Sequence, residues 1–305
     1  MENKKGVFFT VMVIFIITLF FMSYTLYDLV RDRSSVNKRI ETLNNFVFSV
    51  EQDIPRYLYI AGFRSVFLVH EEIVASGDYI GSVEDSFGEL FYNGSLGGVN
   101  KDLMSGATFD YMVDSFGQFA GKVNANISFG VPSVLIDQQD PWNIRISLNL
   151  SMRVSDKGGL VSWDKNMTID SFVPIEGFED PMYLIETGLV TNTIVRSPYD
   201  VFIVGVDVGN LLSHVENSYY VASSSAPSFL DRLEGRNVAS ENGIESFVYL
   251  PGFMAQGVST SDKSCVDYVY FSSNNPVHYS VAGMPSWFGI DEEHVDDYGL
   301  AGVIV

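Results

Sequence analysis

The side chains that could carry out chemistry are few and lie far apart in this chain. Its four histidines stand at positions 70, 214, 278 and 294. His70 begins the run His70-Glu71-Glu72, in which we expect the solvated polar face of a helix. The sequence contains no Gly-x-Ser-x-Gly, no phosphate-binding glycine loop, no His-Glu-x-x-His and no pair of cysteines. We therefore predict no catalytic residue, no metal ligand and no cofactor, and we expect that the protein is not an enzyme.

Two polar clusters come closest to a site. The run from Asp291 to Asp297 offers carboxylates to a hard cation, but it lacks the alternate-residue spacing of a calcium loop, so we expect a charged surface loop. An aspartate, a lysine and a serine directly precede Cys265, but no histidine stands beside them to activate a nucleophile. Cys265 is the one cysteine and cannot form an intrachain disulfide, and its apolar and aromatic neighbours predict a buried thiol beside a strand over residues 266–271.

Four Asn-x-Ser/Thr sequons are candidate glycosylation sites. They are Asn93, Asn126, Asn149 and Asn166. Sequons also arise by chance in a chain rich in Asn and Ser, but three of these four fall on the polar side of predicted strands. This placement indicates an exported, sugar-bearing surface.

The charge of the chain excludes one class of partner. The net charge is −20, and residues 41 to 305 hold 12 Lys or Arg against 35 Asp or Glu. Such an acidic surface repels phosphate backbones and anionic lipid headgroups. We expect no nucleic-acid partner and a folded part that stands away from the membrane surface.

One apolar run opens the chain, from Val7 to Leu26, with no ionisable group before Asp28. As a helix it is roughly 30 Å long, which is the thickness of the hydrocarbon core of a bilayer. We predict a cytoplasmic tail or leader over residues 1–6 and a transmembrane helix over residues 7–27. A cleaved secretory signal is the other interpretation, but no small-x-small site follows the run.

Two sequence signals predict opposite orientations of this helix in the membrane. A count of flanking Lys and Arg places the large domain inside the cell. Long domains are translocated regardless of charge, and the sequons favour the outside. We expect a single-pass protein of the cell membrane, in contact with membrane lipid, whose C-terminal domain is extracytoplasmic.

The segment over residues 28–100 is predicted to form a helical stem and a second helix. Its apolar positions recur every three or four residues, at Val36, Ile40, Leu43, Val47, Val50 and Ile54. Pro55 predicts a kink or the first turn of a second helix over residues 56–75. The apolar face of the stem either packs on the protein's own domain or packs against copies of itself and partner helices.

The rest of the chain predicts an α+β fold, with an antiparallel sheet packed with helices. Residues 101–195 hold a helix over 105–120 and strands with period two, above all over 143–154, which a hairpin loop at 155–159 joins to the next strand. Residues 196–305 form a mixed α+β C-terminal domain. Its expected elements are a buried strand at 201–206, helices at 210–219 and 225–235, the strand at 266–271, and a final core strand at 300–305.

The start of the chain resembles archaeal type IV pilins and pilin-like proteins over about residues 1–50. Lys4-Lys5-Gly6 stands directly before the apolar run and the amphipathic stem. The resemblance implies leader cleavage between Gly6 and Val7 and association of the apolar helix with like or related pilin-type helices. Many pilins carry an acidic residue at the fifth mature position, where this chain has Val11, so it is more similar to the accessory proteins than to a major filament subunit.

These observations predict a membrane-anchored extracytoplasmic structural or interaction protein, pilin-like or pilus-accessory. Two alternatives stay open. One is a surface binding or adhesion module that does not assemble, and the other is a tethered extracytoplasmic hydrolase.

Overall fold

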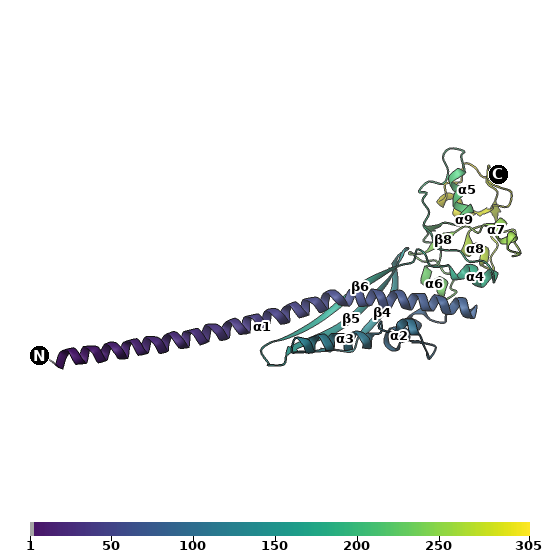
Figure 1. The fold of residues 1–305 in the computed structure, drawn as a ribbon. Helices are drawn as coiled ribbons and strands as arrows, with labels where there is room; N and C mark the ends of the chain where they lie inside the picture. Colours follow the sequence, from purple (N-terminus) through teal and green to yellow (C-terminus); the bar gives the residue numbers. More distant parts are fainter. Residues whose placement is uncertain (1–2) are drawn as a thin grey trace. The chain divides into compact units, whose positions relative to one another are not determined.

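The computed structural model describes residues 3 to 305 and begins with one long helix, α1, from Asn3 to Ser76 (Figure 1). Pro55 lies inside α1, and the predicted second helix is the C-terminal part of this same helix. A proline removes one backbone hydrogen bond and disfavours a helix interior. Ile54 and Leu58, on either side of it, are both buried, so core packing compensates for this loss.

The chain divides into two compact units. The first comprises Met1–Ile54, Val113–Val131 and Ser151–Met167, and the second comprises Pro55–Met112, Pro132–Leu150 and Thr168–Val305.

The main sheet has four strands, and two of its strand pairs, β3 (Ala125–Phe129) with β5 (Asn143–Asp156) and β4 (Ser133–Asp140) with β5, are antiparallel. β5 also pairs with β6 (Ser162–Pro174). Ile127 lies opposite Val154 in one ladder, and Ile136 lies opposite Ile146 in the other. A bulge interrupts β4 between Gln138 and Asp140. The mixed α+β class and its antiparallel sheets are therefore as expected, whereas β4 has no counterpart among the predicted strands.

The period-two prediction for β5 is confirmed at every apolar position. Its apolar side chains are buried, with exposed fractions of 3% or less: Ile144, Ile146, Leu148, Leu150, Met152 and Val154. On the other face, Asn149, Ser151 and Arg153 are exposed. Ser147 departs from this pattern, because only 7% of it is exposed.

In the first unit, the stem of α1 is held by an arginine. Arg39 donates to Asp156 Oδ1 from Nη2 at 2.6 Å and from Nε at 2.8 Å, and it also donates to the carbonyl oxygens of Val123 and Asn124 at 2.6 and 2.7 Å. The hydrogen bond from Arg39 lowers the pKa of Asp156. The stem is therefore fixed to the folded part of its own unit from Arg39 onward.

The predicted apolar stripe divides at this arginine. Leu43, Val47, Val50 and Ile54 are buried, with exposed fractions of 2% or less, whereas Val36 and Ile40 keep 37% and 38% of their surface. In the same unit, α3 (Phe109–Lys122) contributes Phe116, whose ring lies 6.1 Å from that of Phe129. The buried part of the stripe serves the protein's own core, which is the first of the two interpretations.

In the second unit, α1 comes close to the sheet at Gly62. A Cβ atom at this position would lie 1.9 Å from Ile146 Cδ1, so the glycine leaves room for this side chain. α2 (Val83–Asn93) follows, with Ser82 accepting a hydrogen bond from the Asp85 amide as its N-cap. A short hairpin of β1 (Ser95–Leu96) and β2 (Val99–Asn100) and a 3₁₀ turn at Asp102–Met104 lead to α3.

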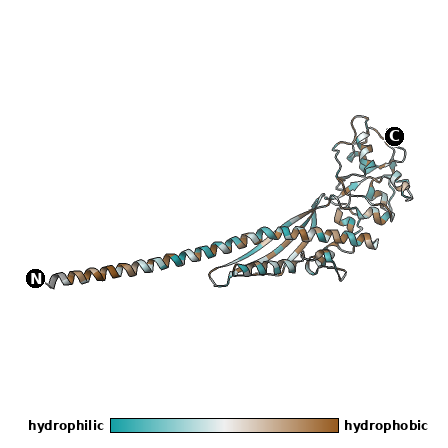
Figure 2. Cartoon of the chain, in the orientation of Figure 1, coloured by the Kyte–Doolittle hydropathy of each residue, from teal (hydrophilic) through white to brown (hydrophobic). Residues whose placement is uncertain are grey.

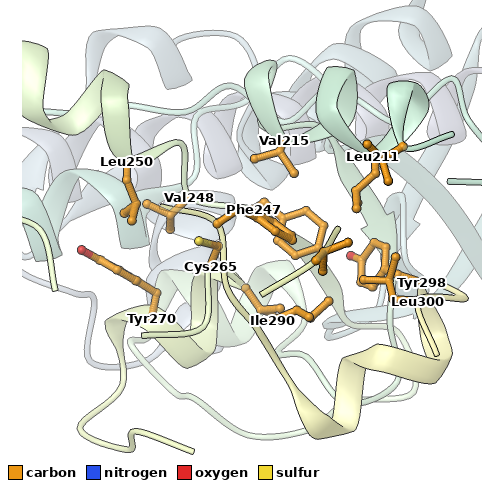
Figure 3. Close-up of a cluster of buried hydrophobic side chains, with 14 of the residues drawn as sticks. Leu211, Val215, Phe247, Val248, Leu250, Cys265, Tyr270, Ile290, Tyr298 and Leu300 are labelled. Atoms are coloured by element: carbon orange, nitrogen blue, oxygen red, sulfur yellow. The ribbon is translucent and has the colours of Figure 1, made fainter. Parts of the chain in front are cut away.

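The remainder of the second unit is built from short elements. They are α4 (Pro181–Thr187), α5 (Gly209–Glu216), β7 (Tyr220–Ala222), α6 (Phe229–Leu233), β8 (Ile244–Ser246), α7 (Leu250–Ala255), α8 (Asp267–Phe271), β9 (His278–Tyr279), β10 (Ile290–Asp291) and α9 (Glu292–Asp297). β7 pairs with β8 and β9 pairs with β10. An apolar cluster joins them around Phe247, whose ring lies 4.7 Å from that of Tyr298 (Figure 3).

Three predicted elements of this part are wrong. Residues 201–206 form no buried strand: Val204 and Asp207 bond to each other across a turn in which Gly205 adopts φ +67°, and Phe202 and Ile203 are only half-buried. Residues 267–271 form helix α8 instead of a strand, since a short apolar run does not distinguish the two by period. The tail at 300–305 belongs to the core as expected, since Leu300 and Val303 are buried, but it forms turns with one bridge between Ile304 and Val281 instead of a strand.

Candidate functional site

The first part of α1 exposes apolar side chains on every side. Phe8, Phe20 and Phe21 expose 73%, 76% and 69% of their surface, and none of the most apolar eighteen-residue window is buried. Figure 2 shows hydrophobic residues concentrated on this part of the helix. Within residues 3–305 this is the one helix that is long and apolar enough to span a membrane.

The hydroxyl groups of this segment bond to its own backbone. Thr10 donates to the Gly6 carbonyl at 3.0 Å, Thr18 to Ile14 at 2.8 Å and Thr25 to Met22 at 3.0 Å. In a bilayer every polar group needs a partner inside the protein. These three threonines already have one, so they do not oppose insertion of the helix.

The predicted cleavage site lies in the first turns of α1. Gly6 and Val7 are both exposed, and a Cβ atom at Gly6 would meet nothing within 4 Å. Glycine inside a helix costs roughly 0.5–1 kcal/mol relative to alanine. Because no contact within the described chain requires it, the glycine has no explanation in the fold itself.

All four sequon asparagines are exposed. Asn93 ends α2, Asn126 lies on β3, Asn149 on β5 and Asn166 on β6. The Oδ1 atom of Asn149 accepts a hydrogen bond from Thr168 at 2.6 Å, whereas a sugar would be attached to its nitrogen. Their modification stays a prediction.

The histidines lie in unrelated environments. His70 is buried, contrary to the expected solvated face, and burial lowers its pKa. Burial also lowers the pKa of His214 to about 3, and its ring lies 5.5 Å from that of Phe247. His278 faces Asp262 at 3.1 Å. In the part of the chain that the structure describes, none of these three histidines lies in a cluster of polar side chains that resembles a catalytic site, and only His294 belongs to a polar cluster.

The expected charged surface loop over residues 291–297 is instead a buried strand end and helix α9. Asp291 and His294 have exposed fractions of 2% and 0%, and Val295 is buried as well. In a helix, positions three and four residues apart share one face. That face turns inward here, and only Glu292, Glu293, Asp296 and Asp297 stay exposed.

A serine, an aspartate and a histidine meet in this region, in an order that does not support nucleophilic catalysis. Ser264 Oγ donates to Asp291 Oδ2 at 2.6 Å, and Asp291 Oδ1 bonds to His294 Nδ1 at 2.6 Å. The carboxylate stands between the other two, so the imidazole has no bond to the serine that it would need to activate.

The charge of His294 leads to the same conclusion. Burial lowers its pKa, but the hydrogen bonds and charges of Asp291 and Glu245 outweigh burial and raise the pKa to about 10. An imidazolium cannot accept a proton as a general base near neutral pH. Burial also raises the pKa of the Cys265 thiol to about 12, which leaves it without thiolate character.

A second buried cluster has no counterpart in the sequence prediction. Arg232 is completely buried, and its Nη1 lies 2.5 Å from Asp180 Oδ2 and 3.0 Å from Asp267 Oδ2. Burial lowers the pKa of Arg232, but the two carboxylates hold it well above its ordinary value. The Tyr220 hydroxyl donates to Asp180 at 2.9 Å. This ion cluster connects α4, α6, α8 and β7, and in sequence Arg232 resembles any exposed residue near a helix end.

Over the described residues, no group of three or more His, Cys, Asp or Glu could hold a metal ion. No protein-family model, curated protein or solved structure matches the chain.

Proposed function

We propose that this protein is a single-pass membrane-anchored protein with an extracytoplasmic folded part, and that its role is structural or interactive, of the pilin-like or pilus-accessory kind. The observation that carries the proposal is the apolar first part of α1, which no other part of the described chain covers. At about 25 cal/mol per Å², such a surface is strongly unfavourable in water. A bilayer and neighbouring helices are the environments that suit it.

The backbone of α1 supports a mechanical role for this segment. The same helix that carries the apolar segment continues to Ser76 without a break. Arg39 and the buried residues after it fix the helix to its own unit. One continuous helix, rather than a flexible linker, therefore connects the apolar segment to the folded part of its unit and can carry a mechanical load between them.

The surface available for association is short. Residues 43–54 of the apolar stripe are used by the protein's own core, so like helices would meet residues 7–40, including Val36 and Ile40. This burial favours the alternative of a non-assembling binding module more than the sequence alone does. A tether and an assembly helix differ only in whether the side-chain surface of residues 7–40 matters.

The exposed sequons support the outward orientation, and Gly6 supports processing. All four asparagines are accessible to a glycosylation enzyme. Gly6 meets no neighbour, so recognition by a peptidase gives a reason for a residue that the fold does not require.

Two measurements test the proposal. Mass spectrometry of the protein from isolated membranes identifies its mature N-terminus. Protease treatment of intact cells shows whether its folded part is outside. We expect a chain that begins at Val7 and whose folded part is digested from outside. A matched Gly6→Val variant should keep its first six residues. A chain that starts at Met1 in both proteins would exclude processing, and a protected folded part would reverse the orientation.

Assembly is tested by replacing residues 7–35 with an unrelated transmembrane helix and the exposed Val36 and Ile40 with serine, which leaves Arg39 and the buried core of the stem intact. Tagged and untagged copies should co-purify in the native form and lose this association after the replacement. Equal co-purification in both would leave the tethered module as the function.

A further inference from the structure

A polar cavity in the second unit lies where α8 and α9 approach two loops. Its volume is about 590 Å³, and its lining includes Asn237, Tyr268, Asn274, Asn275, Glu292 and Glu293. Pockets for small molecules commonly measure about 300–1,000 Å³. A ligand of one or two sugar rings suits this size.

Tyr268 lines the cavity, and its hydroxyl is held by a buried residue outside the lining. The Tyr268 hydroxyl lies 2.9 Å from His294 Nε2, and His294 Nδ1 lies 2.6 Å from Asp291. A protonated His294 donates from both nitrogens, so the Tyr268 oxygen accepts and its own hydrogen is left to donate. No other hydrogen bond of this hydroxyl is found among the residues that the structure describes.

The rest of the lining supplies acceptors and amides without any cation. Glu292 and Glu293 are exposed at the cavity, and neither lysine nor arginine lines it. An anionic ligand would meet only like charge there. The carboxylates do not converge as a metal site does. The lining therefore disfavours an anionic ligand, and its carboxylates, amides and tyrosine suit a ligand rich in hydroxyl groups, which offers both donors and acceptors.

We propose that this cavity binds a neutral carbohydrate, with the Tyr268 hydroxyl donating to a ring or hydroxyl oxygen of the sugar. Glu292, Glu293 and the asparagine amides accept and donate to the remaining hydroxyls, and the Tyr268 ring covers a C–H face. The proposal uses no part of α1, so it stands or falls separately from membrane anchoring.

The test is binding of the full-length detergent-solubilised protein to an array of defined glycans. The array carries neutral oligosaccharides of glucose, galactose, mannose and N-acetylglucosamine, with sulfated and sialylated glycans on the same surface. We expect retention on a subset of the neutral glycans and none on the anionic ones. Tyr268→Phe should weaken that binding about tenfold, the effect of losing one hydrogen bond in a buried contact.

Tyr249→Phe is the matched control, because it also removes one hydroxyl from a half-buried tyrosine but lies outside the cavity lining. It should bind as the native protein does. Near-UV circular dichroism of both variants checks that each is folded, and Glu293→Gln provides a second change at the exposed rim. Absence of binding to every neutral glycan, or equal binding by the native, Tyr268→Phe and Glu293→Gln proteins, overturns the proposal.

Discussion

Residues 7–30 of α1 expose apolar side chains, whereas the region from Asp180 to Tyr298 buries charged ones. Phe20 is 76% exposed in the first, and Arg232, Asp180 and Asp267 have no exposed surface in the second. Both regions reverse the usual distribution of side chains. In the first the compensation must come from outside the chain, and in the second it comes from partners within a few ångströms.

The two regions therefore differ in what stabilises them. Apolar surface in α1 is stabilised only when a bilayer or another helix removes it from water. The buried ions are stabilised by each other, at a desolvation cost that an apolar core would not carry. The stability of the first region therefore depends on the bilayer or helix around it. The stability of the second depends on the presence of every charged partner in the cluster.

Deletion of residues 7–27 tests the first half of the comparison and should have the largest effect. We expect essentially all of the protein to move from the membrane pellet to the soluble fraction, measured after an alkaline carbonate wash. Replacement of the same residues by an unrelated apolar helix should restore the pellet. A deletion variant that still sediments with membranes would show that another part of the chain binds them.

Replacement of Arg232 by methionine tests the second half. It leaves Asp180 and Asp267 buried without their cation, and breaking such a cluster costs about 3–5 kcal/mol in free energy of unfolding. Urea unfolding of the solubilised full-length protein measures this loss.

The matched control is Arg236→Met, four residues further on. The Arg236 side chain is 55% exposed and pairs with Asp231 at 2.7 Å and Glu234 at 2.6 Å. Exposed pairs contribute only about 0–1 kcal/mol. Similar losses for the two variants would mean that Arg232 is hydrated in solution and that the second region is not a closed ion cluster.

Leu148→Arg extends the comparison to the sheet. Leu148 has no exposed surface, so an arginine there should cost about 3 kcal/mol or more. Ser151→Arg, at an exposed position of the same strand, should stay within about 0.5 kcal/mol. Ser147 is unsuitable as the control because it is only 7% exposed. Equal destabilisation by both substitutions would contradict the assignment of faces on β5.

Sequence periodicity was sufficient to predict an element when each of its faces lies in a single environment, either the core or the exterior. The alternation from Ile144 to Val154 predicted β5, and the uninterrupted run after Gly6 predicted the exposed apolar helix. The same reasoning failed for β4, whose apolar residues Val134, Leu135 and Ile136 are consecutive rather than alternating, and for α8, a helix of 5 residues among other short elements. There the surrounding core, rather than the local pattern, selects helix or strand.

The charged clusters were beyond the reach of sequence reasoning for a different reason. Asp180, Arg232 and Asp267 are far apart in the chain, so no local spacing shows that they meet. The expectation for the run 291–297 assumed that consecutive charges share one solvated side. Asp291 and His294 instead share the buried face, and their partners Ser264 and Glu245 come from distant segments.

A pH dependence of stability should separate two of the buried histidines, His214 and His294. The folded-state pKa of His214 is lowered by burial to about 3, so the unfolded chain binds more protons below about pH 6.5. Its contribution to stability is present above that pH and is lost as pH falls toward 3. The pKa of His294 is raised to about 10, so its contribution is present below about pH 6.5 and is lost progressively as pH rises to 10.

Together the two histidines predict a maximum of stability near pH 6.5, with limbs that belong to different residues. Urea unfolding between pH 4 and pH 10 measures both limbs. His294→Gln should flatten the alkaline limb and leave the acidic limb in place, whereas His214→Phe should make the acidic limb shallower, with the contribution of the buried His70 remaining, and leave the alkaline limb in place. If the alkaline limb keeps its slope in His294→Gln, the imidazolium between Asp291, Glu245 and Tyr268 is not the charged group of the folded state. The pairing of buried charge in the second region would then rest on Arg232, Asp180 and Asp267 alone.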